Sequence, residues 1–250
     1  MAPIDSDVVA EGRRLLAAAE SADLPLRLLG GVAIRLRAPR DPPPALARTY
    51  ADLDFVTARR SGGAAATFFR NEGYEPQTAF NALHGRERML FFDTENDRQV
   101  DVFVGTFSMC HRIPLDDRVD LDPLSIPLAE LLLTKLQVIE LNEKDVRDTL
   151  ALVVDHPVGD DDGDTLNAAR VAELCCADWG LCRTITENLS VCREAVQRLE
   201  LAPDERRIAE ERLDALLARI EAGPKTRGWR LRARVGDRKR WYELPEEVRR

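Results

Sequence analysis

Apolar residues in the first 125 positions recur with two different periods, which predicts helices mixed with strands. A spacing of three or four residues predicts helices at residues 5–21, 32–36 and 64–71. Short apolar or alternating stretches predict strands at residues 26–29, 52–57, 86–92 and 99–104. Turn-forming residues fill positions 93–97 between the last two strands, and the Pro-rich stretch 39–47 is predicted to be a loop.

From residue 127 onward the pattern is mostly helical. Helices are predicted at residues 127–141, 143–155, 165–178, 180–199 and 203–222. We therefore predict an α+β fold class, with a small mixed sheet flanked by helices and followed by an α-helical C-terminal part. The predicted domains are an α/β part at residues 1–125, a helical domain at residues 126–222 and an extension at residues 223–250.

The sequence lacks the signals of membrane and secreted proteins. No stretch of about 18 consecutive apolar residues is present, so no membrane association is expected. The N-terminus has no basic segment followed by an apolar one, so no secretory signal is expected. Four of the five cysteines fall between positions 175 and 192 without a Cys-x2-Cys pair, which favours reduced thiols over a zinc site. These features predict a cytoplasmic protein.

Charge is distributed unevenly along the chain. The formal net charge is −8, but residues 223–250 contain ten Lys/Arg and four Asp/Glu, a net charge of +6. Residues 1–222 therefore carry −14, the difference between −8 and +6. Arginines alternate with other residues at positions 230, 232 and 234, so in a strand-like, period-2 conformation they would share one face, and Trp229, Trp241 and Tyr242 lie nearby. The extension either docks onto the acidic remainder of the chain, which we favour, or contacts single-stranded RNA.

Two short motifs in the N-terminal part have candidate chemistry. Gly30 and Gly31 follow a predicted strand and precede a predicted helix, so they either form a plain turn or let the backbone approach a bound anion. Asp52 and Asp54 lie two apart on a predicted strand, which places both carboxylates on one face. Such a pair either faces solvent at a sheet edge or is neutralised by Mg²⁺, which prefers oxygen ligands.

Two further charged residues lie in apolar surroundings. Asp101 interrupts the strand at residues 99–104, and it requires either an arginine partner or a metal ion. Lys135 stands among leucines in the helix at residues 127–141. It either has a buried anionic partner or a bound ligand, or extends its charged end to solvent at the helix edge.

Together, the Gly30–Gly31 turn, the Asp52-x-Asp54 strand and the strand residue Asp101 resemble the nucleotidyltransferase superfamily with a DNA-polymerase-β-like core. Arg48 stands in an Arg-x-x-x-Asp-x-Asp lead-in found in several branches of that superfamily. Residues 131–136, which include Lys135, and residues 144–148 resemble segments of abortive-infection-type and uncharacterised bacterial nucleotidyltransferases. Some of these are toxins of toxin–antitoxin pairs.

The resemblance implies Mg²⁺-dependent transfer of a nucleoside monophosphate from an NTP such as ATP to an acceptor hydroxyl, with release of pyrophosphate. Asp52, Asp54 and Asp101 would be catalytic and hold two Mg²⁺ ions. Binding of the triphosphate would fall to residues of the other motifs: Gly30, Gly31, Arg48 and Lys135. Residues 1–125 would then be the catalytic core.

The resemblance leaves the acceptor open. It could be tRNA or another RNA, a protein or a small molecule, and RNA would contact residues 223–250. One alternative is a catalytically degenerate protein of the same fold that acts as a binding or regulatory partner, for instance in a toxin–antitoxin pair. Another is an aminoglycoside-type antibiotic nucleotidyltransferase, because an acidic protein attracts a polycationic antibiotic.

Overall fold

A computed structural model describes residues 3–244 of the 250-residue chain. Within this range the chain forms two compact units, one from residues 3–37, 49–108 and 112–127, the other from residues 38–48, 109–111 and 128–244. The last six residues of the predicted extension, 245–250, lie outside the described range. The fold is a small mixed sheet with helices, so the predicted α+β class is confirmed.

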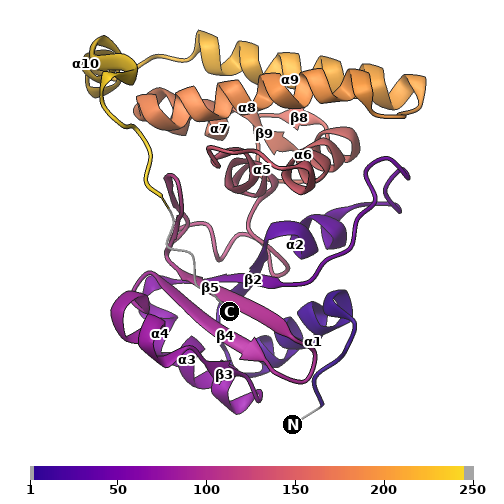
Figure 1. The fold of residues 1–250 in the computed structure, drawn as a ribbon, viewed down its shortest axis with the longest axis vertical. Helices are drawn as coiled ribbons and strands as arrows, with labels where there is room; N and C mark the ends of the chain where they lie inside the picture. Colours follow the sequence, from indigo (N-terminus) through magenta and orange to yellow (C-terminus); the bar gives the residue numbers. More distant parts are fainter. Residues whose placement is uncertain (1–2, 245–250) are drawn as a thin grey trace. The chain divides into compact units, whose positions relative to one another are not determined.

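The first unit is built on a five-stranded sheet of order β1-β2-β5-β4-β3 (Figure 1). Strands β2 and β5 are parallel, and the other neighbours are antiparallel. In chain order the strands are β1 (Leu26–Leu29), β2 (Leu53–Thr57), β3 (Glu75–Pro76), β4 (Arg88–Asp93) and β5 (Arg98–Val104). The strands β6 (Thr106–Ser108) and β7 (Arg112–Pro114) form a separate hairpin.

The helices of this unit are α1 (Val8–Ser21), α2 (Gly30–Arg37), α3 (Gly62–Asn71) and α4 (Thr78–His84). One face of the sheet is apolar, and α1 and α3 cover it. A side chain at Gly12 of α1 would lie against Leu53, and Phe69 of α3 stacks on Phe91 with ring centroids 5.1 Å apart. Burial of this face leaves the opposite face of β2 and β5 to carry polar side chains.

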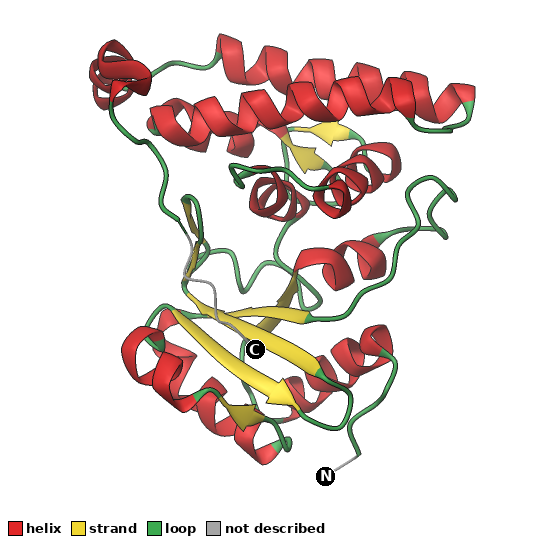
Figure 2. Ribbon diagram, in the orientation of Figure 1, coloured by secondary structure: helices red, strands yellow, loops and turns green. Residues whose placement is uncertain are grey.

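The second unit is largely helical, as Figure 2 shows. Its helices are α5 (Leu128–Leu136), α6 (Glu143–Asp155), α7 (Ala168–Ala177), α8 (Trp179–Arg198), α9 (Pro203–Ala222) and α10 (Arg227–Val235). Two short parallel strands, β8 (Val158–Gly159) and β9 (Leu166–Asn167), precede α7. Fully buried leucines and isoleucines from successive helices form its core, among them Leu131, Ile185, Leu213 and Leu216. No helix among residues 3–244 is long and apolar enough to cross a membrane.

Two expected elements differ from the structure. The helix predicted at 127–141 ends at Leu136, because the Asn188 amide of α8 donates to the carbonyls of Leu136 (2.8 Å) and Val138 (2.6 Å) and satisfies the helix end. The period-2 face expected for residues 230, 232 and 234 is wrong. These residues belong to α10, whose N-cap Thr226 accepts a hydrogen bond from the Trp229 amide at 3.1 Å.

Replacing Asn188 with alanine should destabilise the protein by about 2 kcal/mol, because two backbone carbonyls in a largely buried position lose their donor. Urea denaturation of the full chain measures this change. The matched control is Ser190→Ala on the same helix, where the exposed hydroxyl bonds only to the Thr186 carbonyl and a change within about 0.5 kcal/mol is expected. Equal effects of the two substitutions would contradict the role of Asn188.

Candidate active site

The turn between β1 and α2 brings Asp54 against the backbone. Gly30 has φ of +64°, a conformation that favours glycine, and a Cβ atom there would overlap Oδ2 of Asp54. Strand pairing places Asp54 opposite Leu29, the residue before Gly30. Helix α2 begins at Gly30, with Gly31 as its second residue and no acidic residue in its first turn. The positive end of the helix dipole therefore lies beside a carboxylate.

Parallel pairing of β2 with β5 brings two of the predicted carboxylates side by side. Asp54 stands in register with Asp101, so both side chains lie on the same face of the sheet. Asp52 lies two residues before Asp54, immediately ahead of β2, and is exposed to solvent. Asp101 is almost completely buried, and burial raises its pKa, with a further contribution from the charge of Asp52. The sheet thus pairs Asp54 with Asp101, and Asp52 lies just ahead of the same strand.

Asp101 has an arginine partner, which is one of the two ways in which the sequence predicted that its charge would be neutralised. Arg88 of β4 donates through Nε to Oδ1 of Asp101 at 2.6 Å, and its Nη2 lies 2.5 Å from the same oxygen. Gln99 donates to Oδ2 at 2.7 Å. The guanidinium group of Arg88 also lies over the ring of Phe103, 5.4 Å from its centroid. The charge and hydrogen bonds of Arg88 and the hydrogen bond of Gln99 oppose the effect of burial on the Asp101 pKa.

Sequence reasoning missed Arg88. Its only signal was an arginine at the start of a predicted strand next to the strand of Asp101. Leu90 of β4 lies directly opposite Asp101, and Arg88 is the diagonal neighbour two residues away on the same face. This relation depends on the register of β4 with β5, which the sequence pattern alone does not specify.

The donor set at this face suits a magnesium ion in part. Carboxylate oxygens are the ligands that Mg²⁺ prefers, and Asp52 and Asp54 supply them, Asp54 beside the start of α2. Asp101 is bound to Arg88 and Gln99, so it would join a metal site only by exchanging Arg88 for the cation. Among residues 3–244, no group of three or more His, Cys, Asp or Glu side chains is close enough together to hold a metal ion.

Arg48 and Lys135 lie in the second unit and share one carboxylate. Asp148 of α6 accepts two hydrogen bonds from Arg48, from Nε to Oδ1 and from Nη2 to Oδ2, both 2.6 Å long. Nζ of Lys135 lies 2.9 Å from Oδ2 of Asp148 and 3.4 Å from Oδ1 of Asp145. Asp148 is only 2% exposed. Lys135 therefore has the buried anionic partner that was one of its expected explanations.

The cysteines of the described chain are free and buried. A hydrogen bond with Cys175 lowers the pKa of Cys182 to about 7 against the opposing effect of burial. Nζ of Lys225 donates to Sγ of Cys176 at 3.3 Å. These three thiols of α7 and α8 thus have local hydrogen-bond partners.

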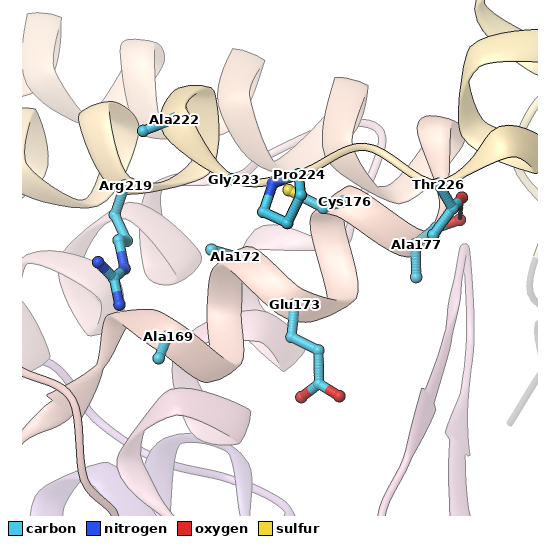
Figure 3. Close-up of a pocket in the computed structure, with 10 residues that line it drawn as sticks. All are labelled: Ala169, Ala172, Glu173, Cys176, Ala177, Arg219, Ala222, Gly223, Pro224 and Thr226. Atoms are coloured by element: carbon cyan, nitrogen blue, oxygen red, sulfur yellow. Dashed lines mark hydrogen bonds between the residues drawn. The ribbon is translucent and has the colours of Figure 1, made fainter.

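A hollow of about 610 Å³ lies in the second unit between α7 and the end of α9 (Figure 3). Its lining is dominated by small side chains such as Ala169, Ala172 and Gly223. Both of its charged lining residues are already paired, Glu173 with Arg170 at 2.9 Å and Arg219 with Asp160 at 3.0 Å. Among the described residues, this hollow thus has no unpaired charged side chain in its lining. It differs in this from the carboxylate face of the first unit, the side of β2 and β5 that carries Asp54 and Asp101.

Comparison with known proteins adds no assignment, because no family model matches the chain and no curated protein matches its sequence. The chemistry of the carboxylate face therefore rests on its own geometry.

Replacing Gly30 with alanine should destabilise the protein by about 2 kcal/mol or more, because the new Cβ occupies the position of the Asp54 carboxylate and the backbone is left-handed. Thermal unfolding measures the change. The control is Gly63→Ala, where a Cβ meets no atom within 4 Å and stability should stay within about 1 kcal/mol. An unchanged melting temperature for Gly30→Ala would argue against the close approach of Asp54 to the turn.

Proposed function

We propose that the chain is a cytoplasmic, Mg²⁺-dependent nucleotidyltransferase with a DNA-polymerase-β-like core. The observation that carries this proposal is the position of Asp54, which is held between the Gly30 turn and Asp101. The turn supplies backbone N–H groups at a helix start, suited to phosphate oxygens, and the strand supplies carboxylates, suited to a cation. A nucleoside triphosphate with bound Mg²⁺ requires both kinds of group in one place.

Asp52 and Asp54 are the residues that would hold Mg²⁺. When bound, two such ions would neutralise the triphosphate and lower the pKa of the attacking hydroxyl. The N–H groups of Gly30 and Gly31 would orient the phosphates. Arg48 and Lys135 remain predicted phosphate-binding residues, and both would have to share their charge with Asp148.

The proposed reaction is a substitution at the α-phosphorus. The acceptor hydroxyl oxygen forms a bond to that phosphorus, and the bond from phosphorus to the oxygen that bridges the α- and β-phosphates breaks. Pyrophosphate leaves with the electron pair of that bond. The hydroxyl proton goes to a base, and Asp101, the third aspartate of the resemblance, is the candidate.

One observation favours a second candidate function. The ion pair between Arg88 and Asp101 supplies the carboxylate with a permanent cation from the protein itself. Such a pair suits a catalytically degenerate member of the same superfamily that binds a partner instead of a nucleotide with Mg²⁺. The two candidate functions give Arg88 different roles. In the enzyme, Arg88 competes with Mg²⁺ for Asp101. In the degenerate protein, Arg88 only stabilises the sheet.

The Asp54→Asn variant should keep its melting temperature within about 3 °C and lose pyrophosphate release by about 100-fold or more, because a metal-binding carboxylate is replaced by an amide. Pyrophosphate is measured with each NTP, Mg²⁺, and total RNA or cell lysate as the acceptor. The control is Asp117→Asn, an exposed aspartate of the same unit, which should be fully active. Equal turnover in both variants would remove the metal assignment.

The Arg88→Gln variant tests the two candidates against each other. It should lose about 3 kcal/mol of stability, because the buried Asp101 loses its counter-ion. In the enzyme, Mg²⁺ should then bind about tenfold more tightly, as measured by titration calorimetry, since the competing cation is gone. Arg86→Gln, at an exposed position before β4, is the control and should change neither quantity. Destabilisation without a change in Mg²⁺ affinity would favour the degenerate protein.

A further inference from the structure

The basic residues 223–244 form two sets with different surroundings. In the inner set, Arg232 donates to the carbonyl of Gly236 at 2.7 Å and its guanidinium lies 4.6 Å from the ring centroid of Trp179. Lys225 donates to the carbonyls of Glu221 and Gly223, both at 3.1 Å. The ring of Trp179 and the thiol of Cys176, 3.3 Å from Nζ of Lys225, join the segment to α8 and α7, whereas the carbonyl partners lie in the segment itself or at the end of α9. None of these contacts uses a carboxylate, so the docking onto the acidic remainder of the chain that the sequence favours stays a prediction.

The outer set lies on the opposite side of α10. Arg227, Arg230 and Arg234 are exposed at spacings of three and four residues, which places them along one face of the helix. Arg238 follows in the next turn and is also exposed. At about 1.5 Å of rise per residue, the three arginines of α10 follow one another at about 4.5 and 6 Å along the helix axis. Within residues 3–244, no carboxylate forms an ion pair with any of these four arginines.

We propose that this row of arginines binds the phosphate backbone of a single-stranded nucleic acid. A strand of nucleic acid presents negative charges at short regular intervals, and the guanidinium fork matches phosphate oxygens. Trp229 and Trp241 face the protein instead: Nε1 of Trp241 donates to Oγ1 of Thr184 at 3.3 Å, and Nζ of Lys225 lies over the ring of Trp229, so the arginines themselves supply the contact with the strand. The remainder of the chain carries net negative charge, so a polyanion is attracted here and repelled elsewhere.

The exposed apolar residues of α10 argue against a membrane surface as the partner. Leu231 is 62% exposed and Val235 is 41% exposed. They lie four residues apart, as a narrow apolar strip along one edge of the arginine face, whereas a helix that lies on a membrane presents a broad apolar face. Two such side chains on a nine-residue helix also present little apolar area.

The test is fluorescence anisotropy of labelled oligouridylate of about 20 nucleotides with the full chain, without NTP or Mg²⁺, so that it does not depend on the proposed transferase activity. Four phosphate contacts predict a slope of about −2.8 for log affinity against log salt, or about 50-fold weaker binding at ~200 mM than at ~50 mM salt. The double variant Arg230→Gln/Arg234→Gln should halve the slope, to about −1.4, and weaken binding at low salt.

The matched control removes the same charge elsewhere. Arg193 and Arg207 are also exposed, but they pair with Asp214 and Glu211, so the variant Arg193→Gln/Arg207→Gln should bind like the parent. Equal loss in both double variants, or no binding by the parent, would overturn the proposal. A single-stranded DNA of matched length is the second probe, and its binding through the same arginines supports the proposal. Binding to phosphatidylserine vesicles without binding to either strand would overturn it in favour of a membrane.

Discussion

The parallel pairing of β2 with β5 is the constraint on which the candidate active site depends. Its register sets Asp54 beside Asp101, and the period of a strand brings Asp52 to the same side. Two neighbouring carboxylates repel each other, and this repulsion must be offset locally. Arg88 neutralises Asp101, and the left-handed Gly30 gives Asp54 space beside the start of α2. A shift of one residue in this register would turn the carboxylates into the apolar core.

Hydrophobic burial on the opposite face of the same sheet offsets the repulsion between the neighbouring carboxylates. Phe55 and Val102 pair across β2 and β5 on that face and are completely buried. Phe55 also contacts Phe69 of α3, which stacks on Phe91 of β4, so the apolar side fixes three elements at once. Hydrophobic burial on one face fixes the register, and on the polar face the ion pair of Arg88 with Asp101 stabilises the sheet further. The other polar side chains of this face can then serve ligand binding or catalysis.

Local patterns in the sequence predicted most of the elements, but contacts between distant residues decided the details. Strands β2 and β5 and the three candidate aspartates follow from alternation within a few residues. The ion pair of Arg88 with Asp101 depends on the register between two strands, and the end of α5 depends on Asn188, 52 residues after Leu136. Helix α10 was misjudged because alternating arginines at 230, 232 and 234 imitate a strand, whereas the helix presents Arg232 inward and its two neighbours outward.

The formal charge of −8 describes the protein poorly, because some of its cations are paired with buried carboxylates and others are exposed. Arg88, Arg48 and Lys135 each lie against a buried carboxylate, so their charges are largely cancelled where they stand. Arg232 is held by a carbonyl and an aromatic ring on its own unit, and its charge is directed inward. Only cations that are both exposed and without an acidic neighbour act on a polyanion at a distance. The arginine row of α10 meets both conditions, so a small cationic surface can determine the partner of an acidic chain.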